Sequence, residues 1–180
     1  MQIQNSGTVA GNICNASPAA DGVPALLALD AQVEVASAAG KRTLPLDQFI
    51  LGPRKTALRQ GELVTAIFVP KPLHPARSDF LKLGARKYLV ISIAMVACVL
   101  EVRDGLVHAA RIAVGSCSPV AMRLPELEQA LAGKPLRNLA ELARPEHLRD
   151  LRPIDDVRAS ADYRREAALT LIRRSLELVA

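Results

Sequence analysis

The most constraining feature of the sequence is the dipeptide Asp104-Gly105, which separates two long runs of strand-forming residues. These runs cover residues 92–103 and 106–115 and are rich in valine, isoleucine and other apolar residues. An Asp-Gly pair between such runs favours a two-residue type I′ turn, because both central positions of that turn require a positive φ. The sequence therefore predicts an antiparallel β-hairpin over residues 92–115.

The last third of the sequence changes from alternation to the helical spacing of apolar residues. Pro125 lies near the start of a first helix, and Gly133 lies just beyond its end. Asn138 is a candidate cap for a second short helix through Ala143, and Ser160 is a candidate cap for a third. The third helix carries an apolar stripe formed by Tyr163, Ala167, Ala168, Leu171, Ile172 and Leu176. Antiparallel strands packed by helices predict an α+β layer.

The residues before this layer are punctuated by Gly, Pro, Asn and Asp, so we expect only short elements there. A helix is predicted over residues 22–29, and strands are predicted over residues 33–35 and 62–69. Two prolines and few apolar residues make residues 71–77 the best linker candidate. The predicted organisation is a domain over residues 1–70, a linker over 71–77 and a second domain over 78–180.

The charge pattern argues against a nucleic-acid partner. The net charge of +5 arises from 23 basic and 18 acidic residues, and the two kinds are interspersed. The pairs Arg164-Arg165 and Arg173-Arg174 lie at helical spacing, and we interpret both as solvated helix faces. Aromatic residues make up only 3% of the chain, which leaves few platforms for base stacking.

Membrane, secretory and metal-binding classes are also disfavoured. The longest apolar stretch, residues 89–100, is too short for a membrane span and contains Ser92. The amino terminus lacks a charged region followed by an apolar run, so we expect a cytoplasmic protein. Cys14, Cys98 and Cys117 show no metal-ligand or disulfide spacing, and we expect each to be a small buried hydrophobe.

The histidines and the paired aspartates are the remaining polar candidates. His74, His108 and His147 are isolated in sequence and are most simply surface or edge residues. Asp155-Asp156 precedes a predicted helix, where adjacent carboxylates favour the helix dipole and capping over a metal pair. We therefore expect no metal site.

The segment GTVAGN, residues 7–12, has the composition of a phosphate-binding loop. Pyrophosphate binding requires backbone N–H groups that point at the anion and residues small enough to let it approach. Thr8 can donate its hydroxyl to a phosphate oxygen, while Ala10 and Gly11 leave the approach open. Asn12 can donate from its amide or brace the loop. Taken alone, such a short glycine-containing string more often marks an ordinary turn.

The longer string NSGTVAGNICNASPAAD, residues 5–21, leads into VPALLA and is far more specific. It resembles, in order and spacing, the second FAD loop of the flavin subunit in the xanthine dehydrogenase and carbon monoxide dehydrogenase family of molybdenum hydroxylases. In that family a Thr-Ile-Gly-Gly-Asn core leads into a Ser-Pro and an Asp. Further similarity lies in PRKT at 53–56, FLKLGAR at 80–86, IAVG at 112–115 with the Ser-Pro that follows, and PIDDVRASADYR at 153–164.

The resemblance implies an α+β fold in which the C-terminal part of a PCMH-type FAD-binding domain is followed by a small domain of antiparallel strands packed by helices. It also implies contacts with FAD. Asp21 matches a polar contact to the cofactor, although it suits equally well a helix cap for residues 25–29. Lys82 matches a family lysine near the flavin, although taken alone it would be a surface lysine at a strand edge. Val64 matches an apolar contact position. The residues matched to the pyrophosphate and ribityl region are Thr8, Val9, Ala10, Gly11 and Asn12.

Two departures from the family pattern bear on FAD binding. Ala10 stands where the family has the first of two paired glycines, which is harmless if its φ is negative. The family's subunit is also longer, and its first glycine-rich FAD loop has no counterpart before Met1.

The function implied by the resemblance is that of a FAD-binding electron-transfer subunit. The family's partners are a molybdopterin-binding large subunit and a 2Fe-2S small subunit, and electrons pass through FAD to an external acceptor such as NAD or a quinone. The missing loop leaves two alternatives open. One is a truncated interaction module that binds partner subunits without flavin, and the other is a site completed by a separate polypeptide.

Overall fold

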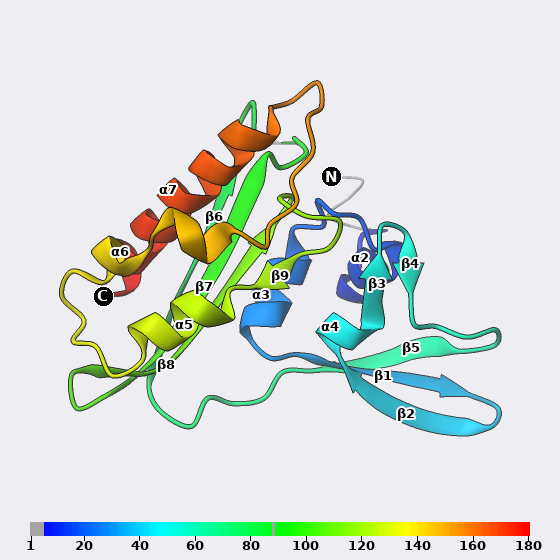
Figure 1. Ribbon diagram of the computed structural model, residues 1–180. Helices are drawn as coiled ribbons and strands as arrows, with labels where there is room; N and C mark the ends of the chain where they lie inside the picture. Colours follow the sequence, from blue (N-terminus) through cyan, green and yellow to red (C-terminus); the bar gives the residue numbers. More distant parts are fainter. Residues whose placement is uncertain (1–5, 88) are drawn as a thin grey trace.

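The structure, a computed structural model, describes residues 6–87 and 89–180. Residues 1–5, at the start of the predicted FAD domain, and residue 88 lie outside the described part. The C-terminal half is built on an antiparallel sheet in the order β6-β7-β8-β9 (Figure 1). Its strands are β6 at Ala76–Leu83, β7 at Ala94–Arg103, β8 at Leu106–Gly115 and β9 at Met122–Arg123. β6 thus includes the last two residues of the predicted linker, Ala76 and Arg77.

The hairpin predicted around Asp104-Gly105 is confirmed. Arg103 pairs with Leu106, and the turn residues Asp104 and Gly105 have φ values of 52° and 75°. Both positive values are those that a type I′ turn requires. The β7 strand is buried without a break from Ala94 to Glu101, because helices pack on both faces of the sheet.

The helices that follow the sheet are α5 at Pro125–Leu131, α6 at Leu139–Leu142, the 3-10 helix η1 at Pro145–Leu148 and α7 at Ala161–Val179. α7 covers one face of the sheet (Figure 1). As predicted, Ser160 caps α7, since its hydroxyl accepts a hydrogen bond of 3.2 Å from the Tyr163 N–H. Five residues of the predicted α7 stripe, from Ala167 to Leu176, are buried in one core cluster with alternate residues of β7. Tyr163 is 49% exposed, so its predicted place in the stripe is wrong. The α+β prediction for this half is confirmed.

The N-terminal part consists of short elements. The helices are α2 at Val9–Asn15, α3 at Gly22–Ala28 and α4 at Leu46–Phe49. The strands are β1 at Gln32–Ser37, β2 at Gly40–Pro45, β3 at Ile50–Gly52, β4 at Lys55–Thr56 and β5 at Leu63–Phe68. One antiparallel sheet has the order β2-β1-β5, and β3 pairs with β4. The predicted short helix and both predicted strands are therefore present.

Helix α3 joins the two parts of the chain, because it packs against β7 and β8 on the face opposite α7. Two arginines of the C-terminal sheet donate to carbonyl oxygens at the end of α3. Arg111 Nε lies 3.0 Å from the Ala28 oxygen, and an Arg123 nitrogen lies 3.3 Å from the Leu27 oxygen. Both arginines also form ion pairs with Asp30. Cations at a helix C-terminus interact favourably with its unpaired carbonyls, so this network locks α3 to the sheet.

The prediction of solvated faces is wrong for Arg164. Arg164 is only 3% exposed, whereas the side chain of its neighbour Arg165 is 44% exposed and pairs with Asp162. Asn138 precedes α6 as predicted but does not cap it. It has a φ of 61°, and its side chain makes no capping hydrogen bond among the described residues. The prediction that Asn138 precedes a helix is confirmed, and the prediction that its side chain caps the helix is wrong.

The structure also bears on the predictions made for the paired aspartates and the histidines. Asp155 accepts a hydrogen bond of 2.6 Å from the Ala161 N–H at the start of α7, as capping requires. His74 and His108 are not isolated in space, since their rings meet edge to face with centroids 4.2 Å apart. No group of metal-ligating side chains large enough to hold an ion occurs within residues 6–87 and 89–180. Over the same residues, no helix has the length and apolar character needed to cross a bilayer.

Candidate cofactor site

The predicted phosphate loop forms the first turn of α2. Thr8 is the N-cap residue, and its Oγ1 accepts a hydrogen bond of 2.9 Å from the Gly11 N–H. The N–H groups of Val9 and Ala10 lie in the first helical turn, where an α-helix supplies no acceptor. An added Cβ at Gly11 would lie 2.9 Å from Thr8 Oγ1, so a larger residue there would make the capping hydroxyl shift. Ala10 is helical and is not among the described residues with positive φ, so alanine is tolerated where the family has glycine.

Asn12 connects this turn to the next helix. Its Oδ1 accepts a hydrogen bond of 3.2 Å from the N–H of Gly22, the first residue of α3. An added Cβ at Gly22 would approach the same oxygen to 2.9 Å. Asn12 therefore braces the loop, which is one of the two roles expected for its amide.

Asp21 and Lys82 form an ion pair between the start of α3 and strand β6. Lys82 Nζ lies 2.5 Å from Asp21 Oδ2 and 3.0 Å from the carbonyl oxygen of Val90. Within the described residues, Asp21 makes no side-chain capping hydrogen bond to α3, so the helix-cap alternative is not supported. The Lys82 side chain is 28% exposed and partnered, unlike a solvated lysine at a strand edge. The structure thus brings together two predicted residues that are 61 positions apart.

Ser92 is not among the cofactor-site residues predicted from the sequence. This residue is 1% exposed, and its hydroxyl donates to Asp21 Oδ1 at 2.7 Å. The one signal for it in the sequence is a polar residue inside the apolar stretch at 89–100.

Val64 lies on β5, half-buried against the N-terminal core and paired with Val35. The helix α2 packs against the same strand.

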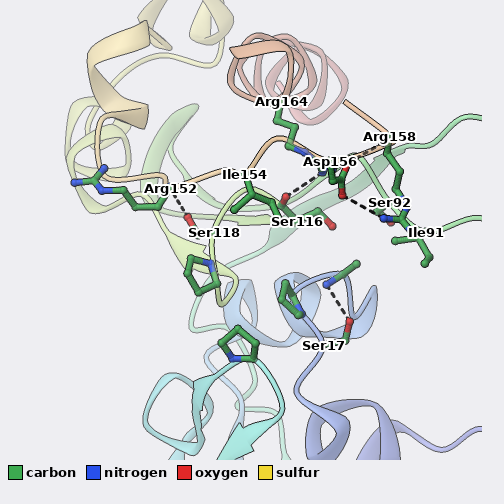
Figure 2. Close-up of a pocket in the computed structure, with 14 residues that line it drawn as sticks. Ser17, Ile91, Ser92, Ser116, Ser118, Arg152, Ile154, Asp156, Arg158 and Arg164 are labelled. Carbon is green, nitrogen blue, oxygen red and sulfur yellow. Dashed lines mark hydrogen bonds and ion pairs between the residues drawn. The ribbon is translucent and has the colours of Figure 1, made fainter. Parts of the chain in front are cut away.

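A cavity of about 350 Å³ lies between the α2–α3 connection and the segment that precedes α7 (Figure 2). Ser92 lines it as well as contacting Asp21. Other lining residues include Ser17, Pro18, Ile91, Ser116, Ile154 and Arg158. The cavity therefore combines apolar walls with hydroxyl and guanidinium groups, a composition typical of small-molecule sites.

Arg164 and Asp156 form the charged wall of this cavity. Arg164 Nη2 lies 2.7 Å from Asp156 Oδ1, and Arg164 Nη1 lies 2.6 Å from the carbonyl oxygen of Ile93. The backbone N–H of Arg158, helped by the Arg164 guanidinium, lowers the pKa of Asp156 to about 2. Arg164 Nε and Ser116 Oγ are buried and have no hydrogen-bond partner among the described residues.

The chain matches two protein families in sequence. Residues 1–72 match the FAD binding domain in molybdopterin dehydrogenase, and residues 79–179 match the CO dehydrogenase flavoprotein C-terminal domain. The class of protein that the fold and the loop define is therefore a FAD-binding flavoprotein of the molybdenum hydroxylases. The chain belongs to the family of FAD-binding medium subunits found in xanthine, carbon monoxide and nicotine dehydrogenases.

Individual relatives agree with this assignment. The medium subunit of nicotine 6-hydroxylase from Paenarthrobacter nicotinovorans is 34% identical over 97% of this chain and 61% of the relative. The xanthine dehydrogenase FAD-binding subunit of Escherichia coli O157:H7 is 31% identical over 96% of this chain and 60% of the relative. A chain of carbon monoxide dehydrogenase from Hydrogenophaga pseudoflava superimposes with a TM-score of 0.89 at 30% identity. That match covers 99% of this chain and 62% of the solved one. This chain thus spans about three-fifths of the length of these relatives.

Proposed function

We propose that this chain is the FAD-binding electron-transfer subunit, or part of it, of a molybdenum hydroxylase. In this role it passes electrons from iron-sulfur clusters of a partner subunit through FAD to an external acceptor. The observation that carries the proposal is the link between the α2 loop and the Asp21–Lys82 ion pair through the Asn12–Gly22 hydrogen bond. These are the positions that match the family's FAD contacts.

The α2 loop fits a pyrophosphate. Under the proposal, Thr8 and the N–H groups of Val9 and Ala10 hold phosphate oxygens, and Gly11 keeps the approach open. An added Cβ at Gly11 would displace the Thr8 hydroxyl, so the glycine supports the role given to Thr8. Asn12 keeps the loop in place by its bond to Gly22.

Lys82 is the residue that we assign to the flavin ring. When bound, a flavin would supply the redox chemistry, and the Lys82 ammonium beside the ring would stabilise negative charge on it. Asp21 holds the Lys82 ammonium, and Val64 supplies an apolar contact that helps to exclude water. None of these roles requires this chain to transfer a proton.

The proposed partners are a molybdopterin-binding large subunit and a 2Fe-2S small subunit. Relatives are named as a medium chain of carbon monoxide dehydrogenase and as a subunit of a dehydrogenase complex, which supports a multi-subunit assembly. The acceptor would be a small molecule such as NAD or a quinone. The cavity supports access for such a molecule, because Ser92, which lines it, also contacts Asp21 of the ion pair.

The test is the stoichiometry of bound FAD, measured by flavin absorbance for the purified chain alone and together with the partner subunits. We expect Gly11→Asp to abolish binding, because the side chain blocks the loop and its charge repels phosphate. Arg174→Asp, on the exposed side of α7, introduces the same carboxylate far from the loop and should leave binding unchanged. Thermal unfolding of both variants separates lost binding from lost folding.

Two results would contradict the proposal. If no FAD binds in either setting, this polypeptide is not the flavin carrier. If Gly11→Asp binds FAD as tightly as wild type, the α2 loop is not part of the site. The alternative function is an interaction module that binds the partner subunits without flavin. It predicts that the chain binds the partner subunits at full stoichiometry with no flavin absorbance.

A further inference from the structure

Ser92 is placed by the backbone of the C-terminal sheet. It stands just before β7, and the next residue, Ile93, donates its N–H to the Leu83 carbonyl at the end of β6 at 2.8 Å. Leu83 is in turn the neighbour of Lys82. The pairing of β6 with the start of β7 therefore fixes the position of Ser92 relative to Lys82.

The two oxygens of Asp21 are shared between these residues. Oδ1 accepts from the Ser92 hydroxyl, and Oδ2 accepts from the Lys82 ammonium. A carboxylate held at both oxygens cannot rotate about its terminal bond without losing a partner. Lys82 Nζ also donates to the Val90 carbonyl at 3.0 Å. The fixed carboxylate is its second acceptor, and two fixed acceptors orient a charge at the end of four flexible methylene groups better than one.

We propose that Ser92 is a positioning residue that, through Asp21, fixes the Lys82 ammonium at the place where the flavin ring is bound. Only the part of this inference that concerns the flavin ring rests on the proposed function. The coupling from Ser92 to Lys82 is a property of this chain by itself. In the alternative, Ser92 is a buried hydroxyl with a convenient acceptor, and its removal leaves Lys82 where it is.

The surroundings of Ser92 allow a clean set of variants. Ser92→Ala removes the hydroxyl, and Ser92→Thr keeps it at a position that lines the cavity. Ser116→Ala is the matched control, since Ser116 lines the same cavity and its hydroxyl bonds no described residue. The control removes a hydroxyl from the same cavity and leaves the hydrogen bonds of Asp21 unchanged.

The first measurement needs no cofactor. The rate at which an acetylating N-hydroxysuccinimide ester modifies Lys82 is followed by peptide mass spectrometry, with exposed Lys134 as the reference in each sample. We expect Ser92→Ala to raise the Lys82 rate by about threefold to tenfold, the population change that corresponds to losing one hydrogen bond. Ser92→Thr and Ser116→Ala should match wild type. An unchanged rate in Ser92→Ala, or an equal rise in Ser116→Ala, would overturn the proposal.

The second measurement is the midpoint potential of FAD in the assembled protein. We expect Ser92→Ala to lower it, because a mobile ammonium stabilises the reduced ring less well, and Ser92→Thr to restore it. A faster Lys82 reaction with an unchanged potential would refute the role toward flavin. If no variant binds FAD, the proposed function fails, while the labelling rates still decide whether Ser92 positions Lys82.

Discussion

Replacing Arg164 by methionine is the sharpest test of the packing at the cavity wall. Arg164 is 3% exposed and donates to the Ile93 carbonyl, the Ser116 carbonyl and Asp156. Methionine keeps part of the apolar stem and removes every donor. Breaking a fully buried ion pair costs roughly 3–5 kcal/mol, because the remaining charge has lost its partner. The Asp156 side chain is 24% exposed and keeps two backbone donors, so we expect a loss of about 3 kcal/mol.

The assay is urea unfolding, with the free energy of unfolding obtained by linear extrapolation. The matched control is Arg165→Met, one position further along α7. Arg165 pairs with Asp162, whose side chain is 97% exposed, and such a surface pair contributes less than about 1 kcal/mol. We expect the control to lie within about 0.5 kcal/mol of wild type. If Arg164→Met also lies within that range, the buried-guanidinium argument is wrong.

The remaining predictions concern acid and thiol chemistry. The pKa of Asp156 is lowered from 3.8 to about 2, so its contribution to stability is present above about pH 4 and is lost as pH falls toward 2. The difference in unfolding midpoint between wild type and Asp156→Asn should therefore shrink over that range, and a constant difference would contradict the assignment. Burial raises the pKa of Cys98 to about 12 and that of Cys117 to about 11. An aromatic disulfide reagent at neutral pH should react first with half-buried Cys14, and equal rates for all three thiols would disagree.

The elements that were predictable from sequence are those set by neighbours in the chain. The Asp104-Gly105 turn depends on which residues tolerate a positive φ, and the start of α7 depends on a hydroxyl at Ser160. Asn138 shows the limit of such rules. Its position before α6 was predictable, but its left-handed backbone removed the side chain from the capping geometry.

The candidate site divides in the same way. The order and spacing of residues 5–21 are local and carried the resemblance to the FAD loop. The two partners of Asp21 are distant in sequence, since Lys82 lies 61 positions away and Ser92 lies 71 positions away. No periodicity joins such distant residues, and Ser92 stood out only as a polar residue in an apolar run.

The sequence by itself determined the turns, the helix starts, the α+β class and the family of the FAD loop, because each depends on residues a few positions apart. Only the tertiary structure decided which polar groups became buried and with which partners. Arg164 and Arg165 are adjacent and chemically identical, yet successive helix positions point in directions about 100° apart. The packing of α7 on the sheet turned one toward Asp156 and the Ile93 carbonyl and left the other in solvent.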